Sequence, residues 1–244
     1  MGTYVRGGVF VVLVVIIVWG AGGCQMSVVN GSGRVQTESR MVQGFTEVDL
    51  SGQGTLTITQ GADEALTIEA EDNLLPALTS DVQQGRLVLG TKASTILRAS
   101  KPIRYDLRVK DLSAIRLSGA GNINATTFRA DSLELRTSGS GTIQIDQLAA
   151  NALTSRISGA GDQLIGGIAP RQDVTISGAG NYRAASLASR EANVSVSGTG
   201  NVDVRVSDAL AVKISGMGRV EYSGSPRVTS DISGLGRINQ AAVR

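Results

Sequence analysis

The sequence predicts an all-β protein in which the chain winds as a parallel β-solenoid. The tetrapeptide Ser-Gly-x-Gly begins at Ser51 and then recurs from Ser118 to Ser233 at steps of 18 to 20 residues. Apolar residues alternate with polar residues on both sides of most copies. Glycine accounts for 31 of the 244 residues, whereas aromatic residues make up only 3%. A repeat of this length is typical of a solenoid, whose coils bury a core only when they stack.

The residues on either side of each tetrapeptide are predicted to form two short strands per coil. Directly before the serines stand Leu50, Leu117, Thr137, Ile157, Ile176, Val196, Ile214 and Ile232. Five places after them stand Leu56, Ile123, Ile143, Gln163, Tyr182, Val202, Val220 and Ile238. Most are Leu or β-branched, and their neighbours alternate with the period of a strand. We expect these positions to point inward and to form columns when coils stack about 4.8 Å apart.

The glycines of the tetrapeptide are predicted to form the corners of the coils. Glycine adopts a positive φ at low steric cost and suits a tight bend that stacks on the bend below. Asn tolerates the left-handed conformation and bonds locally, which suits Asn122, Asn181 and Asn201 after three corners. The corner glycines are Gly52, Gly54, Gly119, Gly121, Gly139, Gly141, Gly159, Gly161, Gly178, Gly180, Gly198, Gly200, Gly216, Gly218, Gly234 and Gly236.

The predicted solenoid domain spans residues 42–240, followed by a tail over residues 241–244. Residues 51–118 lack a clear corner but keep strand alternation at Leu66 and Ile68 and at Leu87 and Leu89. This segment is expected to form irregular coils that cover the N-terminal end, with a short helix or turn at residues 73–78. Because the tail is short, the last coil is expected to leave an exposed pairing edge.

The first residues are predicted to be an export and anchoring signal. Arg6 precedes an unbroken apolar run of 11 residues, Val9 to Trp19, which is too short to cross a bilayer. Small residues and then the only cysteine follow, and Ala21-Gly22-Gly23-Cys24 resembles the bacterial lipobox, with Ala in place of its usual Leu. Residues 1–23 are therefore predicted to be a signal peptide and Cys24 to be lipidated. Ordinary signal cleavage and an uncleaved anchor remain alternatives.

The segment after Cys24 is polar and irregular in sequence. Residues 24–41 are therefore expected to be a lipidated N-terminus with a flexible tether. Gln25, rather than Asp, follows the cysteine, which favours the outer over the inner membrane of a bacterial cell envelope.

The chain also resembles a known family, the head GIN domain family of auto-transporter adhesin-like proteins. The matching features are Gly44-Phe45-Thr46-Glu47-Val48-Asp49-Leu50, Asp72-Asn73-Leu74-Leu75, Gly85-Arg86-Leu87-Val88-Leu89 and the repeated Ser-Gly-Ala-Gly corners. Gly121-Asn122-Ile123-Asn124 and Gly236-Arg237-Ile238-Asn239 bracket the repeat region. The resemblance implies a right-handed parallel β-helix and an adhesin-like role, and it brings no binding residues with it.

Composition excludes several classes of site. The chain has no histidine and one cysteine, so it lacks the ligands of a His or paired-Cys zinc site, the base of a Ser-His-Asp hydrolase and an intrachain disulfide. A net charge of +2 without a basic run, together with few aromatic residues, argues against nucleic acid as a partner. No metal and no cofactor are predicted.

One outward column carries a candidate binding site. Arg116, Arg136 and Arg156 stand two places before successive corner serines and are predicted to stack on adjacent coils. Stacked guanidinium groups would suit a polyanion, such as acidic polysaccharide or lipid phosphate. The alternative is a solvated face whose charges are balanced by nearby carboxylates such as Glu134, because like charges on neighbouring strands repel.

A second outward column carries a pair of carboxylates. Asp203 and Glu221 stand six places after their serines on adjacent coils, and glycoside hydrolysis requires two carboxyl groups roughly 5–10 Å apart. The alternative is a polar surface column, because no aromatic ring is evident beside the pair. The corner serines lack the flanking pattern and the base of a nucleophile elbow, so no catalytic residue is predicted.

The sequence thus predicts a non-enzymatic, lipid-anchored envelope protein that presents a solenoid surface for binding or adhesion. Its expected partners are the membrane, through the lipid anchor, and an envelope polysaccharide or another envelope protein. A polysaccharide-acting β-helix enzyme and a self-assembling structural subunit are the alternatives.

Overall fold

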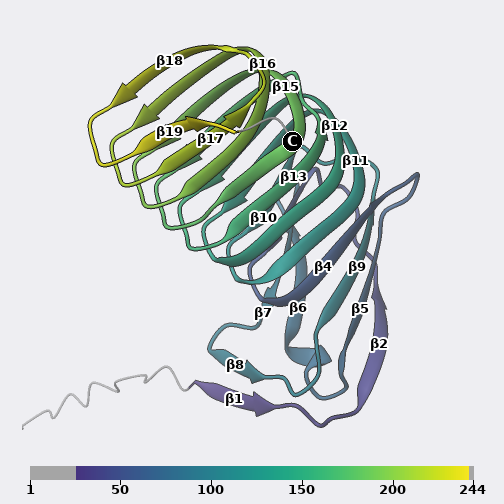
Figure 1. Ribbon diagram of the computed structural model, residues 1–244. Coiled ribbons are helices and arrows are strands. Elements are labelled where there is room, and N and C mark those ends of the chain that lie inside the picture. The colour runs from purple at the N-terminus through teal and green to yellow at the C-terminus, as the bar shows by residue number, and fades with distance from the viewer. Residues whose placement is uncertain (1–25, 242–244) are drawn as a thin grey trace, which may run out of the picture.

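The computed structural model describes residues 26–241 and shows a β-solenoid standing on a base of strands from the N-terminal part of the chain (Figure 1). The predicted signal peptide and Cys24 lie outside the described residues. Within them, no helix is long and apolar enough to cross a membrane.

The solenoid consists of parallel strands that pair coil upon coil. Strands before and after the corners are β3 (Glu47–Leu50), β4 (Gln53–Gln60), β10 (Ala114–Leu117), β11 (Ala120–Thr137), β12 (Ser140–Ile157), β13 (Asp162–Ile168), β14 (Arg171–Ile176), β15 (Tyr182–Val196), β16 (Asn201–Ile214), β17 (Arg219–Ser223), β18 (Arg227–Ile232) and β19 (Arg237–Gln240). The longest of them, such as β11 and β12, run from one corner to the next without a break. All pairings among these strands are parallel.

The inward columns pair as the repeat predicts. Ile115 lies beside Val48 on one side and Leu135 on the other, and Ile157 lies beside Ile176. Residues directly before the serines are at most 1% exposed from Leu50 to Ile214, and only Ile232 of the last coil is 43% exposed. The stacked aliphatic rows therefore form one continuous core, which is the main source of stability of a solenoid.

Polar residues interrupt these columns where they can bond to each other. Gln163 accepts a hydrogen bond from the Ser155 hydroxyl (2.5 Å) and donates one to Thr137 Oγ1 (3.0 Å) inside the core. A few residues further along, the Tyr182 hydroxyl donates to Gln172 Oε1 (3.0 Å), whose amide donates to Ser189 (2.8 Å). Buried polar groups are tolerated when they are paired. The polar residues that interrupt the apolar pattern of the sequence are hydrogen-bonded to each other inside the core.

The Ser-Gly-x-Gly segments lie where one strand ends and the next begins, and they stack backbone on backbone. A Cβ atom added at Gly139 would overlap the carbonyl oxygen of Gly119, and one added at Gly178 would overlap that of Gly159. Among the corner glycines only Gly54 (φ 123°) and Gly141 (φ 124°) have a positive φ. The conformational reason expected for these glycines is therefore wrong for most of them. They are needed because adjacent backbones approach too closely for any side chain.

The asparagines after the corners also act between coils. Asn201 Nδ2 donates to Asn181 Oδ1 (2.9 Å), and Asn181 Nδ2 donates to Asp162 Oδ1 (2.8 Å). None of the three predicted asparagines has a positive φ. The left-handed conformation expected of these asparagines is therefore wrong. The side-chain amides of Asn181 and Asn201 link successive coils instead.

The base closes the N-terminal end of the solenoid. β7 (Arg86–Thr91) and β9 (Arg104–Val109) add parallel strands beneath β3 and β4. β5 (Ala65–Glu71) and β6 (Leu78–Gln83) then pair in antiparallel fashion with β9 and β7. A short 3-10 helix, η1 (Leu75–Ala77), lies where the sequence predicts a helix or turn. This base is the irregular cover expected from residues 51–118.

The prediction of a flexible tether over residues 24–41 is wrong for most of that segment. β1 (Ser27–Asn30) pairs with β8 (Thr95–Arg98) in a separate two-stranded ribbon, and β2 (Val35–Arg40) pairs with β5 along its whole length. The alternation of apolar and polar residues did not reveal these strands, because nearly all residues of β2 are exposed. Backbone pairing, rather than apolar burial, holds β2 in place.

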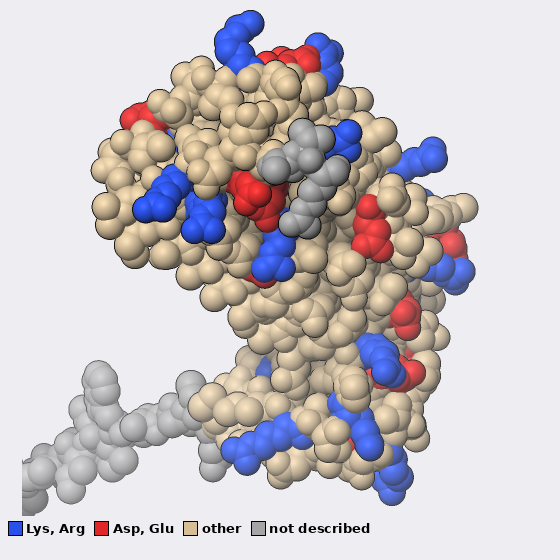
Figure 2. Space-filling view, in the orientation of Figure 1, with Lys and Arg blue, Asp and Glu red and all other residues tan. Residues whose placement is uncertain are grey.

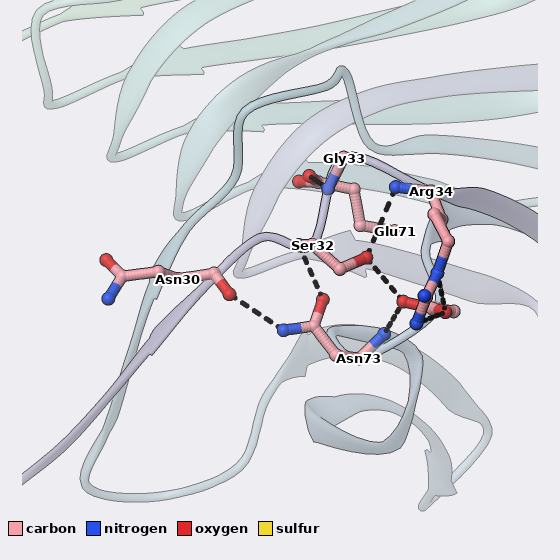
Figure 3. A network of polar contacts seen from close by, with 7 residues as sticks. Asn30, Ser32, Gly33, Arg34, Glu71 and Asn73 are labelled. Carbon is pink, nitrogen blue, oxygen red and sulfur yellow. Dashed lines mark hydrogen bonds and ion pairs between the residues drawn. The ribbon is translucent and has the colours of Figure 1, made fainter.

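A buried carboxylate fastens this N-terminal segment to the base. Glu71 is fully buried, and its carboxylate accepts hydrogen bonds from the Gly33 amide (2.6 Å), the Ser100 amide (2.8 Å) and the Ser100 hydroxyl (2.6 Å). Beside it, Asp72 and Asn73 bond to the chain between β1 and β2 (Figure 3). The Ser100 hydroxyl, helped by the backbone amides and opposed by burial, lowers the pKa of Glu71 to about 2. We call this set of contacts the N-terminal clasp.

The opposite end of the solenoid is open within the described residues. β18 and β19 pair only with β16 and β17 beneath them, and all six residues of β18 are exposed. The described part of the chain therefore presents one covered end and one unpaired edge, as the sequence predicts.

Candidate functional site

The three predicted arginines lie side by side on one outer face. Arg116 pairs in register with Arg136, and Arg136 pairs with Arg156, so their side chains leave three successive coils at the same position. β10 and the C-terminal parts of β11 and β12 position them, with inward residues on either side anchoring each strand. We call these three residues the arginine ladder.

Carboxylates stand between the guanidinium groups. Glu134 contacts all three arginines, at 3.6 Å from Arg116, 2.7 Å from Arg136 and 3.6 Å from Arg156. Glu47 bridges Arg116 (3.1 Å) to Arg86 (2.8 Å) of the base. The repulsion expected of stacked like charges is therefore offset by carboxylates in the neighbouring outward column.

The ion pairs hold these carboxylates in their charged form. Burial alone would raise the pKa of Glu134, but the hydrogen bond from Arg136 and the charges of all three arginines together lower it. The hydrogen bond from Arg86 lowers the pKa of Glu47 against the effect of burial, with help from Arg116. The same pairing raises the pKa of Arg136. These shifts favour the charged forms of Glu47, Glu134 and Arg136.

The ladder lines a shallow depression of about 420 Å³. Corner serines Ser118, Ser138, Ser158 and Ser177 line it together with the arginines, Arg86 and Asp49. Arg116 is mostly buried, with 17% of its side chain exposed, whereas Arg136 and Arg156 are 46% and 53% exposed. Two accessible guanidinium groups beside a row of hydroxyls are suited to carboxylate, sulfate or phosphate oxygens and to sugar hydroxyls.

Two members of the ion-pair cluster escaped sequence reasoning. Arg86 and Glu47 join the cluster because β7 lies beneath β3, a pairing that no repeat signals. Glu47 stands four places before Ser51, as Glu134 does before Ser138. That shared spacing is the signal that could have identified it.

The carboxylate pair is also brought together as predicted. Asp203 and Glu221 are register partners on β16 and β17, with Arg183 on the coil before and Asn239 on the coil after. Burial, and then the charge of Glu221, raises the pKa of Asp203. Among the described residues, no group of three or more His, Cys, Asp or Glu side chains is placed to hold a metal ion.

A protein family described as "Putative auto-transporter adhesin, head GIN domain" matches residues 44–226, about three quarters of the sequence. The chain belongs to the head GIN domain family. The match covers the base from just before β3, together with the coils up to β17. The family's description places head GIN domains among adhesin-like proteins, which indicates a protein of the cell envelope or surface and a non-enzymatic class.

Solved structures share the fold of this head GIN domain. A putative adhesin from Bacteroides fragilis aligns with a TM-score of 0.84 at 24% identity, over 87% of this chain and 100% of its own. A protein from Parabacteroides distasonis titled a putative lipid binding protein aligns at 0.75 and 19% identity, over 88% and 100%. A putative adhesin from the same species aligns at 0.71 and 22% identity, over the same shares. No curated protein matches the chain.

Proposed function

We propose that this head GIN domain is a non-enzymatic, lipid-anchored envelope protein that binds an anionic polymer along the arginine ladder. The observation that supports this most directly is the in-register stacking of Arg116, Arg136 and Arg156 over a row of corner serines. A polymer with an anionic group on each repeating unit would meet equivalent side chains on successive coils, spaced about 4.8 Å apart.

The electrostatic balance of the cluster favours binding over a purely structural network. Four guanidinium groups face the three carboxylates of Glu47, Asp49 and Glu134, which leaves a net positive charge. Arg116 is shared between two glutamates, but Arg136 and Arg156 share only Glu134 and are half exposed. These two residues therefore provide the accessible charge, while Arg116 organises the carboxylates.

Binding of full-length protein to polygalacturonate, with neutral dextran as the reference polymer, tests this proposal. Replacing Arg136 and Arg156 together by Gln should weaken binding to polygalacturonate at least ten-fold, because each charge-assisted contact contributes more than a neutral one. Arg129 and Arg205, which are exposed and make no ion pair among the described residues, provide the matched control pair. Equal affinity of the ladder variant and the control variant would contradict the proposal.

The lipid anchor is part of the proposal and has its own test. Radiolabelled palmitate should enter the full chain and not the Cys24→Ala variant, and the protein should fractionate with membranes. A soluble, unlabelled product would contradict the anchor and leave the polymer site to be judged by the binding experiment. Because Gln25, rather than Asp, follows Cys24, the anchored protein is expected in the outer membrane.

A polysaccharide-acting enzyme is the weaker candidate. Asp203 and Glu221 stand directly beside each other on a solenoid face, and neither lines the depression of the arginine ladder. A sugar ring would need to lie between two separated carboxyl groups for hydrolysis. The unsubstituted protein should therefore leave the length of polygalacturonate unchanged over time, and the Asp203→Asn variant should bind the polymer equally well.

Self-association is a second candidate, favoured by the outer edge of β18, which pairs with no strand among the described residues. An antiparallel pair of β18 strands from two copies, centred on Thr229, would place Arg227 opposite Asp231 of the second copy. Opposite charges in such cross-strand positions are stabilising. Because the base covers the other end of the solenoid, this pairing would close as a dimer. Sedimentation velocity should show the dimer, and Arg227→Glu should shift it to monomer while Arg129→Glu does not.

A further inference from the structure

We propose that the outer face of the β1–β8 ribbon is a docking surface for the anionic headgroup region of a lipid bilayer. We call this surface the foot; it consists of Met26, Val28 and Ile96 together with Lys92, Arg98 and Lys101. The inference rests on the proposed lipid anchor for its geometry and goes beyond it in naming a second membrane contact.

The ribbon has one face packed on the base and one face exposed. Val28 pairs in register with Ile96, and Val29 pairs with Leu97. Leu97 packs against the core, so Val29 and Leu97 lie on the inner face. Side chains alternate along a strand, and accordingly Val28 is 46% exposed, Ile96 42% and Met26 64%.

Three exposed large apolar side chains on one two-stranded ribbon are unusual without a partner. An exposed apolar cluster of this kind commonly marks an interaction surface. The ribbon pairs with no other strand in the described part of the chain. In Figure 1 the ribbon lies at the end of the base that is farthest from the last coils.

The charges around the ribbon select an anionic partner. Arg98 lies two residues beyond Ile96 on the same face, Lys92 precedes the ribbon and Lys101 follows it. All three are exposed, and none forms an ion pair with any described residue. Two acidic residues of the adjoining N-terminal clasp are already engaged, because Glu71 is buried and Asp72 pairs with Arg34 (2.8 Å).

Figure 2 shows a Lys or Arg side chain on this flank of the base. Cations near a membrane surface attract anionic lipids, at about a five-fold gain in binding for each. Apolar side chains beside them insert into the boundary between headgroups and acyl chains. The foot combines both elements on one surface.

The position of the foot in the chain identifies the partner as the bilayer. Met26 is two residues after Cys24, so their Cα atoms lie within about 7 Å of each other. The N-terminal clasp and the pairing of β2 with β5 fix residues 26–40 to the base, so that this segment cannot extend as a tether between the lipid and the domain. A lipid attached to Cys24 would therefore hold the outer face of β1 at the headgroups.

The single cysteine of the chain allows a direct test. In processed full-length protein the lipid occupies Cys24, so an introduced Ile96→Cys is the only thiol available for an environment-sensitive NBD probe. The protein is reconstituted into vesicles of phosphatidylcholine alone or with one quarter phosphatidylglycerol. Leu235→Cys, at an 81% exposed position in the last corner, is the matched control.

The proposal expects the probe at position 96 to shift to the blue and to be quenched by brominated lipid at least two-fold more than the probe at position 235. The difference should be larger with phosphatidylglycerol. Replacing Lys92, Arg98 and Lys101 by Gln should reduce it, whereas replacing Arg129, Arg171 and Arg205 by Gln should not. Equal quenching at the two positions would overturn the foot.

Two other outcomes are also decisive. A probe at position 96 that is already shielded without vesicles would mean that protein covers the ribbon, which overturns a lipid partner. Labelling of the unsubstituted chain would mean that Cys24 carries no lipid and would contradict the anchor. In that case the probes at positions 96 and 235 are compared in a Cys24→Ser background. Stronger quenching at position 96 would support the foot, and equal quenching would overturn it.

Discussion

Replacing Gly161 by Ala should destabilise the solenoid far more than replacing Gly61 by Ala. A Cβ atom at Gly161 would lie 2.6 Å from the carbonyl oxygen of Gly141 and 2.6 Å from Cγ2 of Thr137, where ordinary contacts are 3.4–4 Å. At Gly61 the only heavy atom within reach is a flexible Asp63 oxygen at 3.9 Å. Neither glycine has a positive φ, so backbone strain does not distinguish the two positions.

The magnitude follows from what must move. To accept the new methyl group, the coil carrying Gly161 has to rise from the coil below by about 1 Å. The amides of Ser158 and Ala160 donate across this gap at 2.9 Å and 3.1 Å, and such a rise would break both bonds. Two hydrogen bonds at about 1 kcal/mol each, with about 1–3 kcal/mol for overpacking, give roughly 3–5 kcal/mol.

Urea unfolding followed by circular dichroism measures this difference. Gly61→Ala should be neutral or stabilise by about 0.4–1 kcal/mol, because Ala restricts the unfolded chain. Gly161→Ala should lower the unfolding midpoint with little change in the slope of the transition. If both variants unfold at the same urea concentration, close backbone stacking is not the reason for glycine at the corners.

Three further predictions concern the buried polar groups. Stability should fall as the pH drops from about 4.5 to about 2, because Glu71 has a pKa lowered from 4.5 to about 2 and stabilises the fold only while ionised; urea midpoints across that range should lose much of this dependence in Glu71→Gln. Gln163→Leu should destabilise by about 2 kcal/mol or more by stranding two buried hydroxyls, and making those two positions apolar as well should recover most of the loss, as calorimetry would show. Tyr182→Phe should cost about 1–3 kcal/mol, whereas Tyr105→Phe should be neutral or stabilising because its buried hydroxyl has no partner among the described residues.

Sequence reasoning was strongest where a residue's environment repeats. Each inward position of a coil meets the same position above and below, so Leu117 and Ile176 could be assigned to the core from spacing alone. The stacking of Arg116, Arg136 and Arg156 followed from the same spacing. Register is a property of the period, and a period is visible in one sequence.

It was weakest where structure depends on contacts between unlike segments. β2 has no apolar face, and its place is set by antiparallel pairing with β5, some 30 residues away. Nothing in the sequence distinguishes Glu71 from other polar residues. It is nevertheless buried, because backbone amides from two distant loops donate hydrogen bonds to its carboxylate. Such pairings depend on loop lengths and chain direction, which leave no periodic signal.

The two proposed surfaces constrain each other through the geometry of the stack. The β1–β8 ribbon belongs to the base, and Arg156 lies four layers above β7 through β3, β10 and β11. At about 4.8 Å per layer, the arginine ladder extends from roughly 10 Å to 20 Å above β7. A domain whose base rests on the bilayer would therefore present its cationic depression nearer to the membrane than its last coil is. An anionic polymer of the cell's own envelope could reach that position along the surface, whereas a ligand on another cell would first meet the last coil, where β18 and β19 are exposed. The geometry thus favours retention of an envelope polymer by the ladder and leaves contacts with other proteins to the open end.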